Sequence, residues 1–191
     1  SWKKVEDFVK KNLPKSALTE VKKIYQLAKK DGSTGSPQDA QVIKSLVYMT
    51  GLQSENREDN EVLSIREIEK EIIGSKEPVT SILNSPPAEM YWNYYQQNRW
   101  DLYNRTKTAD FKKDDMATWG AEDFHEKVGE LYQRSLRDEK LLQQTKLLPF
   151  DAIIIKGNVR HLRPTLFDLL AHRALGYFEN DERDINKPAY A

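Results

Sequence analysis

Apolar residues recur three or four positions apart along the first half of the chain, the spacing of the buried side of a helix. This spacing predicts helices over residues 2–12, 15–30, 37–51, 62–77 and 79–95. Pro14 separates the first two, because the residue before a proline avoids the helical conformation. Pro86 and Pro87 fall inside the fifth segment and predict a kink or a break into two pieces there.

The second half continues the helical pattern after a polar connection over residues 106–118. Thr118 is suited to cap a sixth helix, whose apolar stripe would run from Phe124 to Leu136. The segment 149–155 is predicted as a short extended piece. Pro164 is suited to the first position of a last helix that continues to Phe178.

The predicted helices follow one another at intervals typical of helical-repeat arrays, in which two helices occupy roughly 40–47 residues. We therefore predict an all-α fold, an α-solenoid or tetratricopeptide-like stack of about six to eight helices. It would form a single domain over residues 1–180, with residues 181–191 as an exit linker. The apolar pattern is already under way at Trp2, so we expect the chain to be part of a longer protein.

Charge and composition narrow the function. The 30 basic residues balance the 30 acidic residues, so no overall field attracts nucleic acid or an anionic membrane. The chain contains no cysteine, which excludes disulfides, thiolate metal sites and cysteine nucleophiles. No apolar run is long enough to cross a bilayer, so direct membrane insertion is not expected.

Catalytic patterns are not found. His125-Glu126 is not followed by a second histidine four residues later, so the zinc-protease motif is missing. Asp168 and His172 lie four apart, which favours an ordinary pair within a helix over an oriented catalytic imidazole. Nucleophile elbows, phosphate-binding glycine loops and dinucleotide fingerprints are also missing. We predict a protein that is not an enzyme and that has no metal and no cofactor.

The richest stretch is 88–106, where aromatic residues alternate with arginines. Its polar end supplies the candidate interaction residues Arg99, Trp100, Tyr103 and Arg105. Aromatic and basic side chains together can stack the bases of single-stranded nucleic acid. The neutral net charge favours another interpretation, in which the arginines stack on core aromatics and the stretch is the hub of packing. Trp100→Ala would then lower stability, by roughly 3–5 kcal/mol if the ring is fully buried.

The segment 163–175 has two interpretations as well. Arg163, Pro164 and Leu166 could begin a helix that faces a partner. A core helix with a proline near its start and an arginine lying along it explains the same residues more simply. We favour the core helix.

Several segments, taken in order, resemble a known family across nearly the whole chain. They are Leu13-Pro14-Lys15-Ser16-Ala17-Leu18, Ile24-Tyr25-Gln26-Leu27-Ala28, Ile43-Lys44-Ser45-Leu46-Val47-Tyr48, Ala88-Glu89-Met90-Tyr91-Trp92-Asn93-Tyr94-Tyr95, Asn98-Arg99-Trp100, Tyr103-Asn104-Arg105-Thr106, Arg163-Pro164-Thr165-Leu166-Phe167-Asp168 and Ala171-His172-Arg173-Ala174-Leu175. The set resembles the N-terminal helical region of the large alpha-2-macroglobulin-like proteins of Bacteroidetes-type bacteria. Pro86-Pro87 departs from it, because helix-friendly apolar residues are expected there.

This resemblance implies an envelope protein, secreted or lipid-anchored, that traps or guards against proteases in the periplasm or at the cell envelope. The macroglobulin domains and any thioester would lie downstream, since a thioester requires a cysteine. The chain would be a non-catalytic scaffold or interaction module. Its partners would be other domains of the same polypeptide or another envelope protein, and not nucleic acid. The alternative is a peptide- or protein-binding helical repeat that acts independently of protease inhibition.

Overall fold

The computed structural model describes residues 1–30, 37–54, 60–103, 116–151, 153–154 and 160–180. Eight α-helices account for most of them: α1 (Trp2–Lys10), α2 (Pro14–Lys30), α3 (Pro37–Ser54), α4 (Asn60–Gly74), α5 (Val79–Tyr103), α6 (Ala121–Ser135), α7 (Glu139–Gln144) and α8 (Leu166–Phe178). Three short 3₁₀ helices, Met116–Thr118, Leu148–Phe150 and Arg160–Leu162, complete the regular structure. The all-α class predicted from the sequence is confirmed.

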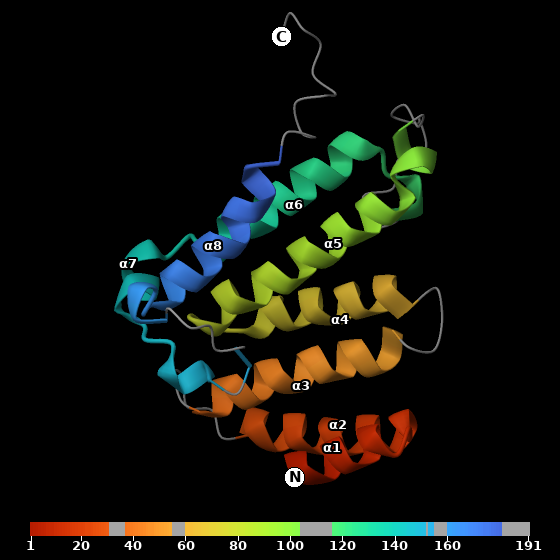
Figure 1. Ribbon diagram of the computed structural model, residues 1–191, viewed down its shortest axis with the longest axis vertical. Coiled ribbons are helices and arrows are strands. Elements are labelled where there is room, and N and C mark those ends of the chain that lie inside the picture. Colours follow the sequence, from red (N-terminus) through yellow and green to blue (C-terminus); the bar gives the residue numbers. More distant parts are fainter. Residues whose placement is uncertain (31–36, 55–59, 104–115, 152, 155–159, 181–191) are drawn as a thin grey trace, which may run out of the picture.

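The helices lie side by side in chain order along the long axis of the molecule (Figure 1). The layer formed by α1 and α2 is at one end, α3, α4 and α5 follow, and α6 lies at the other end, where α8 returns against α5 and α6. Each helix from α1 to α5 packs against the next one in the sequence. None of the helices in the described part of the chain combines the length and apolar character that a bilayer crossing requires.

The first two helices are separated by a local backbone conformation. Asn12 has a φ of 54°, in the left-handed region that asparagine adopts more readily than most residues. The helix α1 therefore ends at Lys10, and Pro14 opens α2 at a position where its missing N–H costs nothing.

The break expected at Pro86 and Pro87 is wrong: α5 is a single helix of 25 residues that contains both prolines. Each proline removes one hydrogen bond from the helical ladder, so the helix needs support from its surroundings. Packing supplies it, since α5 contacts α3, α4, α6 and α8, and Leu83 and Ala88 on either side of the prolines are almost fully buried.

Two predicted helix starts are also wrong. Thr118 lies in a 3₁₀ helix, and α6 begins after Gly120, whose N–H donates to Asp123 Oδ2 at 2.9 Å. The last helix begins at Leu166, two residues after Pro164. Thr165 caps it, because Thr165 and Asp168 exchange backbone-to-side-chain hydrogen bonds of 2.9 and 3.2 Å.

The extended piece predicted near residues 149–155 does not form where the structure describes that segment. Leu148–Phe150 is a 3₁₀ helix, and residues 151, 153 and 154 lie in turns and bends. The only ladder-like contact in the described residues nearby is an isolated antiparallel bridge between Lys146 and Thr165. The predicted exit linker at residues 181–191 lies outside the described residues.

The interior consists of two clusters. The first, here called the aliphatic core, comprises Val5, Ala17, Val21, Ala40, Ile43, Leu46, Met49, Leu52, Val79, Ile82, Leu83, Leu142, Leu147, Phe150, Leu166 and Leu170. The second, here called the aromatic core, comprises Ile65, Ala88, Tyr91, Tyr95, Leu102, Met116, Trp119, Phe124, Val128, Leu131, Tyr132, Ala174 and Tyr177. The aliphatic core lies toward α1–α3 and the aromatic core toward α6.

Both α5 and α8 pass from one core to the other. On α5 the change falls between Leu83 and Ala88, where the two prolines lie. On α8 it falls between Leu170 and Ala174. A polar link joins the helices at this boundary.

That link is made by Arg173 of α8. Its Nε donates to Ser85 Oγ at 2.8 Å, and its guanidinium also pairs with the Glu89 carboxylate. Ser85 is buried, so the hydroxyl gains a charged donor at a place where water has little access.

Candidate interaction site

The candidate residues Arg99 and Trp100 lie in the last turn of α5. The side of α5 that faces the aromatic core is marked by Tyr91, Tyr95 and Leu102, each no more than 5% exposed. At about 100° per residue, Trp100 lies roughly 180° around the helix axis from Tyr91. The tryptophan therefore points away from the core, and it is 76% exposed. The expectation that Trp100 belongs to the hub of packing is wrong.

The half-buried Arg99 lies against the exposed Trp100. The guanidinium carbon of Arg99 lies 4.9 Å from the centre of the Trp100 ring, a cation–π contact. One residue earlier, Asn98 Nδ2 donates to the carbonyl of Tyr94 at 2.8 Å and so stabilises the last turns of the helix. Arginine does stack on an aromatic ring, as expected, but the ring is at the surface instead of in the core.

The structure does not describe the side chains of the other two candidate residues, Tyr103 and Arg105. Tyr103 is the last residue of α5, and its side chain lies outside what the structure describes. Arg105 lies wholly outside the described residues. The candidate site therefore consists of Arg99 and Trp100.

Aromatic stacking holds the end of α5 in place from the inside. Tyr91 stacks on Trp119 with ring centres 5.3 Å apart, and Tyr95 meets Phe124 at 6.0 Å. Trp92 meets Tyr177 of α8 edge-on at 5.2 Å. Such contacts contribute about 0.5–1.5 kcal/mol each beyond the area they bury. The exposed tryptophan is thus carried by a rigid segment.

His125 of α6 lies inside this group of rings. Its ring centre is 5.0 Å from Tyr95 and 5.5 Å from Trp92. The hydroxyl of Tyr177 donates to the carbonyl of His125 at 3.0 Å and lies 3.0 Å from His125 Nδ1. Because the hydroxyl proton is used by the carbonyl, Nδ1 is the donor in the second bond. The histidine thereby joins α6 to α8.

Histidines elsewhere do not gather into a site. His161 and His172 are exposed, and Asp168 is engaged with Thr165 at the start of α8. The part of the chain that the structure describes holds no group of three histidine, aspartate or glutamate side chains that could bind a metal ion.

The helix α4 carries two charged clusters that sequence reasoning missed. In the Glu71 cluster, Tyr25 of α2 donates its hydroxyl hydrogen bond to Glu71, and Lys29 Nζ lies 2.6 Å from the same carboxylate. Lys29 also lies 5.3 Å from the centre of the Tyr25 ring. The hydrogen bond to Glu71 raises the pKa of Lys29. Burial raises the pKa of Tyr25, and the hydrogen bond to the Glu71 carboxylate raises it further.

The Glu69 cluster repeats this arrangement toward the other end of the molecule. Tyr91 of α5 donates to Glu69 Oε1 at 3.3 Å, and Lys127 Nζ of α6 lies 2.7 Å from the same atom. Lys127 is 5.6 Å from the centre of the Tyr91 ring. Burial, reinforced by the negative charge of Glu69, raises the pKa of Tyr91 well above its usual range. Each cluster joins a lysine and a tyrosine to α4.

Comparison with protein-family models, with curated proteins and with solved structures finds no match to this chain. The geometry of the described residues and the resemblance in the sequence are therefore the basis for the function proposed next.

Proposed function

We propose that this chain is a non-catalytic helical scaffold that docks a protein partner through Arg99 and Trp100. The observation that carries the proposal is a tryptophan ring, 76% exposed, at the end of the longest helix. Tryptophan and arginine are enriched among the residues that dominate the energetics of protein interfaces, and tryptophan buries a large area at a small cost in conformational entropy. The rings beneath fix the direction in which Trp100 projects, which lowers the entropy lost on binding further.

The partner we propose is another domain of the same polypeptide. The sequence segments that resemble the N-terminal region of bacterial alpha-2-macroglobulin-like proteins support this choice. In such a protein the chain would hold later domains at the cell envelope and take part in protease trapping only indirectly. A stack of helices tied together from α1 to α8 is suited to that task, and its repeat-like order supports the α-solenoid interpretation.

A second candidate function is a helical repeat that binds a separate peptide or protein and has no connection with protease inhibition. The same exposed Trp100 favours it, since an anchor on a rigid helix end serves a partner in trans equally well.

Site-specific photo-crosslinking separates these functions. A benzophenone amino acid replaces Trp100 in the full-length protein within intact cells, and Lys140, exposed on α7, carries it in the control. We expect a crosslink from position 100 to a later domain of the same chain. A crosslink to a different polypeptide would assign the second function. Labelling at position 140 but not at position 100 would overturn both, and reading the gene beyond Ala191 for macroglobulin domains tests the family independently.

A further inference from the structure

The zero net charge of the chain conceals a strong separation of charge. Residues 1–30 contain nine lysines and three acidic residues, and so carry six net positive charges. The remaining residues carry 21 basic and 27 acidic side chains, which compensate those charges. The positive segment is the layer of α1 and α2 at one end of the molecule (Figure 1).

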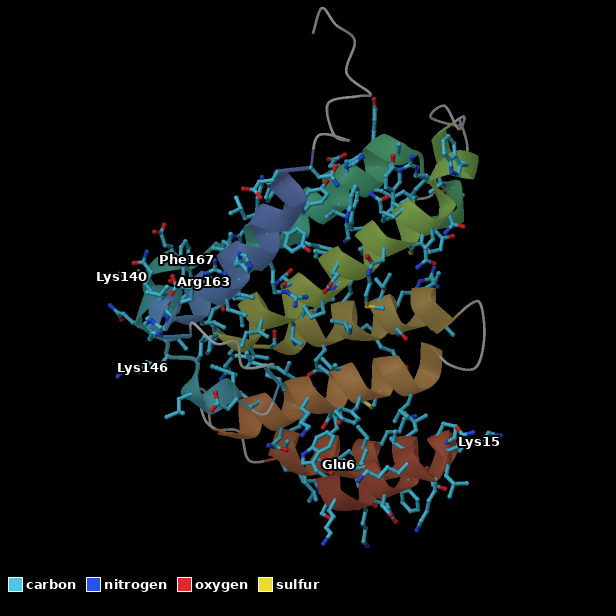
Figure 2. All side chains as sticks on the ribbon, viewed as in Figure 1. Glu6, Lys15, Lys140, Lys146, Arg163 and Phe167 are labelled. Carbon is cyan, nitrogen blue, oxygen red and sulfur yellow. The ribbon has the colours of Figure 1, made fainter. Side chains whose placement is uncertain are left out.

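All nine lysines of this layer are exposed to solvent. On α2, Lys15 and Lys22 are seven residues apart and so lie on one side, with Lys22 roughly 140° around the axis from the buried Ala17. On α1, Lys3 and Lys10 have the same spacing, roughly 140–160° from the buried Val5. Figure 2 shows Lys15 projecting outward from this layer. The lysines of α1 and α2 are here called the lysine face.

Few of these charges are neutralised by the protein itself. Lys11 pairs with Asp7, Lys23 with Glu20 and Lys29 with Glu71. The other six have no carboxylate within 4.0 Å in the described ranges: Lys3, Lys4, Lys10, Lys15, Lys22 and Lys30. Six cations on two short antiparallel helices repel one another. An anionic surface that approaches the layer relieves this repulsion and so lowers its electrostatic free energy.

The chemistry of the lysine face selects among anionic partners. Residues 1–30 contain no arginine, and arginine is the residue suited to reading single phosphates or bases with paired hydrogen bonds. The aromatic residues of the layer, Trp2, Phe8 and Tyr25, are packed against the aliphatic core. Lysines act as point charges on flexible stems, and a laterally extended charged surface reaches many of them at once.

We propose that the lysine face adsorbs to an anionic phospholipid membrane without inserting into it. Most apolar side chains of α1 and α2 are turned into the aliphatic core, and the large apolar residues left exposed in this layer are Val9, Leu13 and Leu27. Attraction between lysines and lipid headgroups therefore supplies most of the binding. The proposal is independent of the docking role of Arg99 and Trp100, because these residues belong to α5, and α3 and α4 separate that helix from the layer of α1 and α2 (Figure 1).

The test measures binding to vesicles by co-sedimentation. Vesicles of phosphatidylcholine alone are compared with an equimolar mixture of phosphatidylcholine and phosphatidylglycerol. We expect binding only to the anionic mixture. The binding should disappear between about 0.1 M and about 1 M salt, where the screening length falls from about 10 to about 3 Å.

Charge-reversal variants locate the surface. K15E/K22E reverses two charges on the lysine face, and we expect the partition coefficient to fall by at least about tenfold, since each lysine contributes about fivefold. K140E/K146E reverses two exposed lysines near α7, labelled in Figure 2, and changes the net charge equally. The control pair should retain nearly all binding, and so should Trp100→Ala. Circular dichroism verifies the fold, and K3Q/K10Q replaces the first pair if that one does not fold.

Three results would overturn the proposal. One is the same vesicle binding by the two charge-reversal pairs, which would assign the effect to net charge. Another is no binding of the unmodified chain to anionic vesicles at low salt. The third is tighter binding to polyglutamate or to duplex DNA than to vesicles, which would assign an acidic protein or a nucleic acid as the partner.

Discussion

The aliphatic core and the aromatic core use the same helices with different chemistry. Phe150 is the one aromatic member of the aliphatic core, whereas six of the thirteen members of the aromatic core are aromatic. Aliphatic side chains fill space and have no polar atoms to satisfy. Tyrosine and tryptophan fill space and also need hydrogen-bond partners when they are buried. Tyr91 meets that need through Glu69, and Tyr177 through His125.

The difference shows how a single stack acquires two ends with distinct properties. The aliphatic core supports the layer of α1 and α2, whose outer side bears only lysines as its cations. The aromatic core fixes neighbouring rings at defined angles, and it supports the helix end that carries Trp100. We expect the aromatic half to depend more on the identity of each side chain, and the aliphatic half more on total volume.

The largest loss of stability is expected when the buried phenylalanine of either core is replaced by alanine. Phe124 and Phe150 are 0% and 1% exposed, so Phe124→Ala and Phe150→Ala should each lower the free energy of unfolding by about 3–5 kcal/mol. Chemical denaturation followed by circular dichroism measures this loss. A cost below about 1 kcal/mol for either variant would show that the ring is not enclosed as described.

A conservative substitution separates the cores more sharply. Phe124 has ring contacts with Tyr94, Tyr95 and Trp119, whereas the described residues give Phe150 none. Phe124→Leu should therefore destabilise the protein by about 1–3 kcal/mol more than Phe150→Leu does, because only the former loses aromatic pairs. Equal losses in the same denaturation experiment would remove the distinction between the two cores.

The Glu71 and Glu69 clusters on α4 can be compared in the same way, with smaller expected losses of stability. The side chain of Glu71 is 13% exposed and that of Glu69 is 29% exposed. Glu71→Gln should cost about 1–2 kcal/mol, and Glu69→Gln about 1 kcal/mol or less, because screening by water weakens the more exposed pair. Raising the salt concentration should widen the difference, because salt screens the more exposed Glu69 pair more strongly. A larger loss from Glu69→Gln would reverse the order inferred from burial.

Alkaline pH should lower the stability of the protein through the tyrosines whose pKa values are raised. In the folded protein the pKa values of Tyr25, Tyr91 and Tyr132 are raised, chiefly by burial, so the neutral hydroxyl is favoured. The stability that each contributes is present below about pH 10, the ordinary pKa, and is lost as the pH rises toward the folded pKa. For Tyr91 this loss is about 1 kcal/mol at about pH 10.5.

Thermal unfolding measured between about pH 9 and about pH 11 checks this dependence. Tyr91→Phe should flatten the slope against pH, since phenylalanine has no proton to lose. An unchanged slope in that variant would show that the Tyr91 hydroxyl is ionised as easily in the folded as in the unfolded chain.

The smallest effect on stability is expected at the candidate interaction site. Trp100→Ala should change the free energy of unfolding by no more than about 0.5 kcal/mol, as surface substitutions usually do. Trp119→Ala is the matched control, since Trp119 is 5% exposed, and it should cost about 3–5 kcal/mol. A large loss from Trp100→Ala would restore the packing role that its exposure contradicts.

The helices were predictable from the sequence because their apolar stripes follow the helical period closely, as Ile65 and Ile68 do in α4. The exposure of Trp100 was predictable too, from its angle to Tyr91. The aromatic residues of this stretch lie on different sides of α5, so their clustering in the sequence does not place them all in the core. The continuity of α5 through Pro86 and Pro87 was not predictable, because it depends on packing against four other helices.

The clusters of Glu69 and Glu71 could not be found from local patterns. Their partners lie in α2, α5 and α6, and no spacing within the sequence pairs Tyr25 with Glu71 or Lys127 with Glu69. The lysine face was hidden for a different reason, since the positive charge of residues 1–30 is cancelled by the excess of acidic residues over the rest of the chain.

The arrangement of Glu69 and Glu71 has a consequence for how α4 can move. Two residues apart on a helix, their side chains point in roughly opposite directions. One is held from the α2 side and the other from the α5 and α6 side. Turning α4 about its own axis in either sense would pull both carboxylates away from their lysines together. The two clusters therefore oppose rotation of α4 about its axis in either sense, in addition to holding the helix between its neighbours.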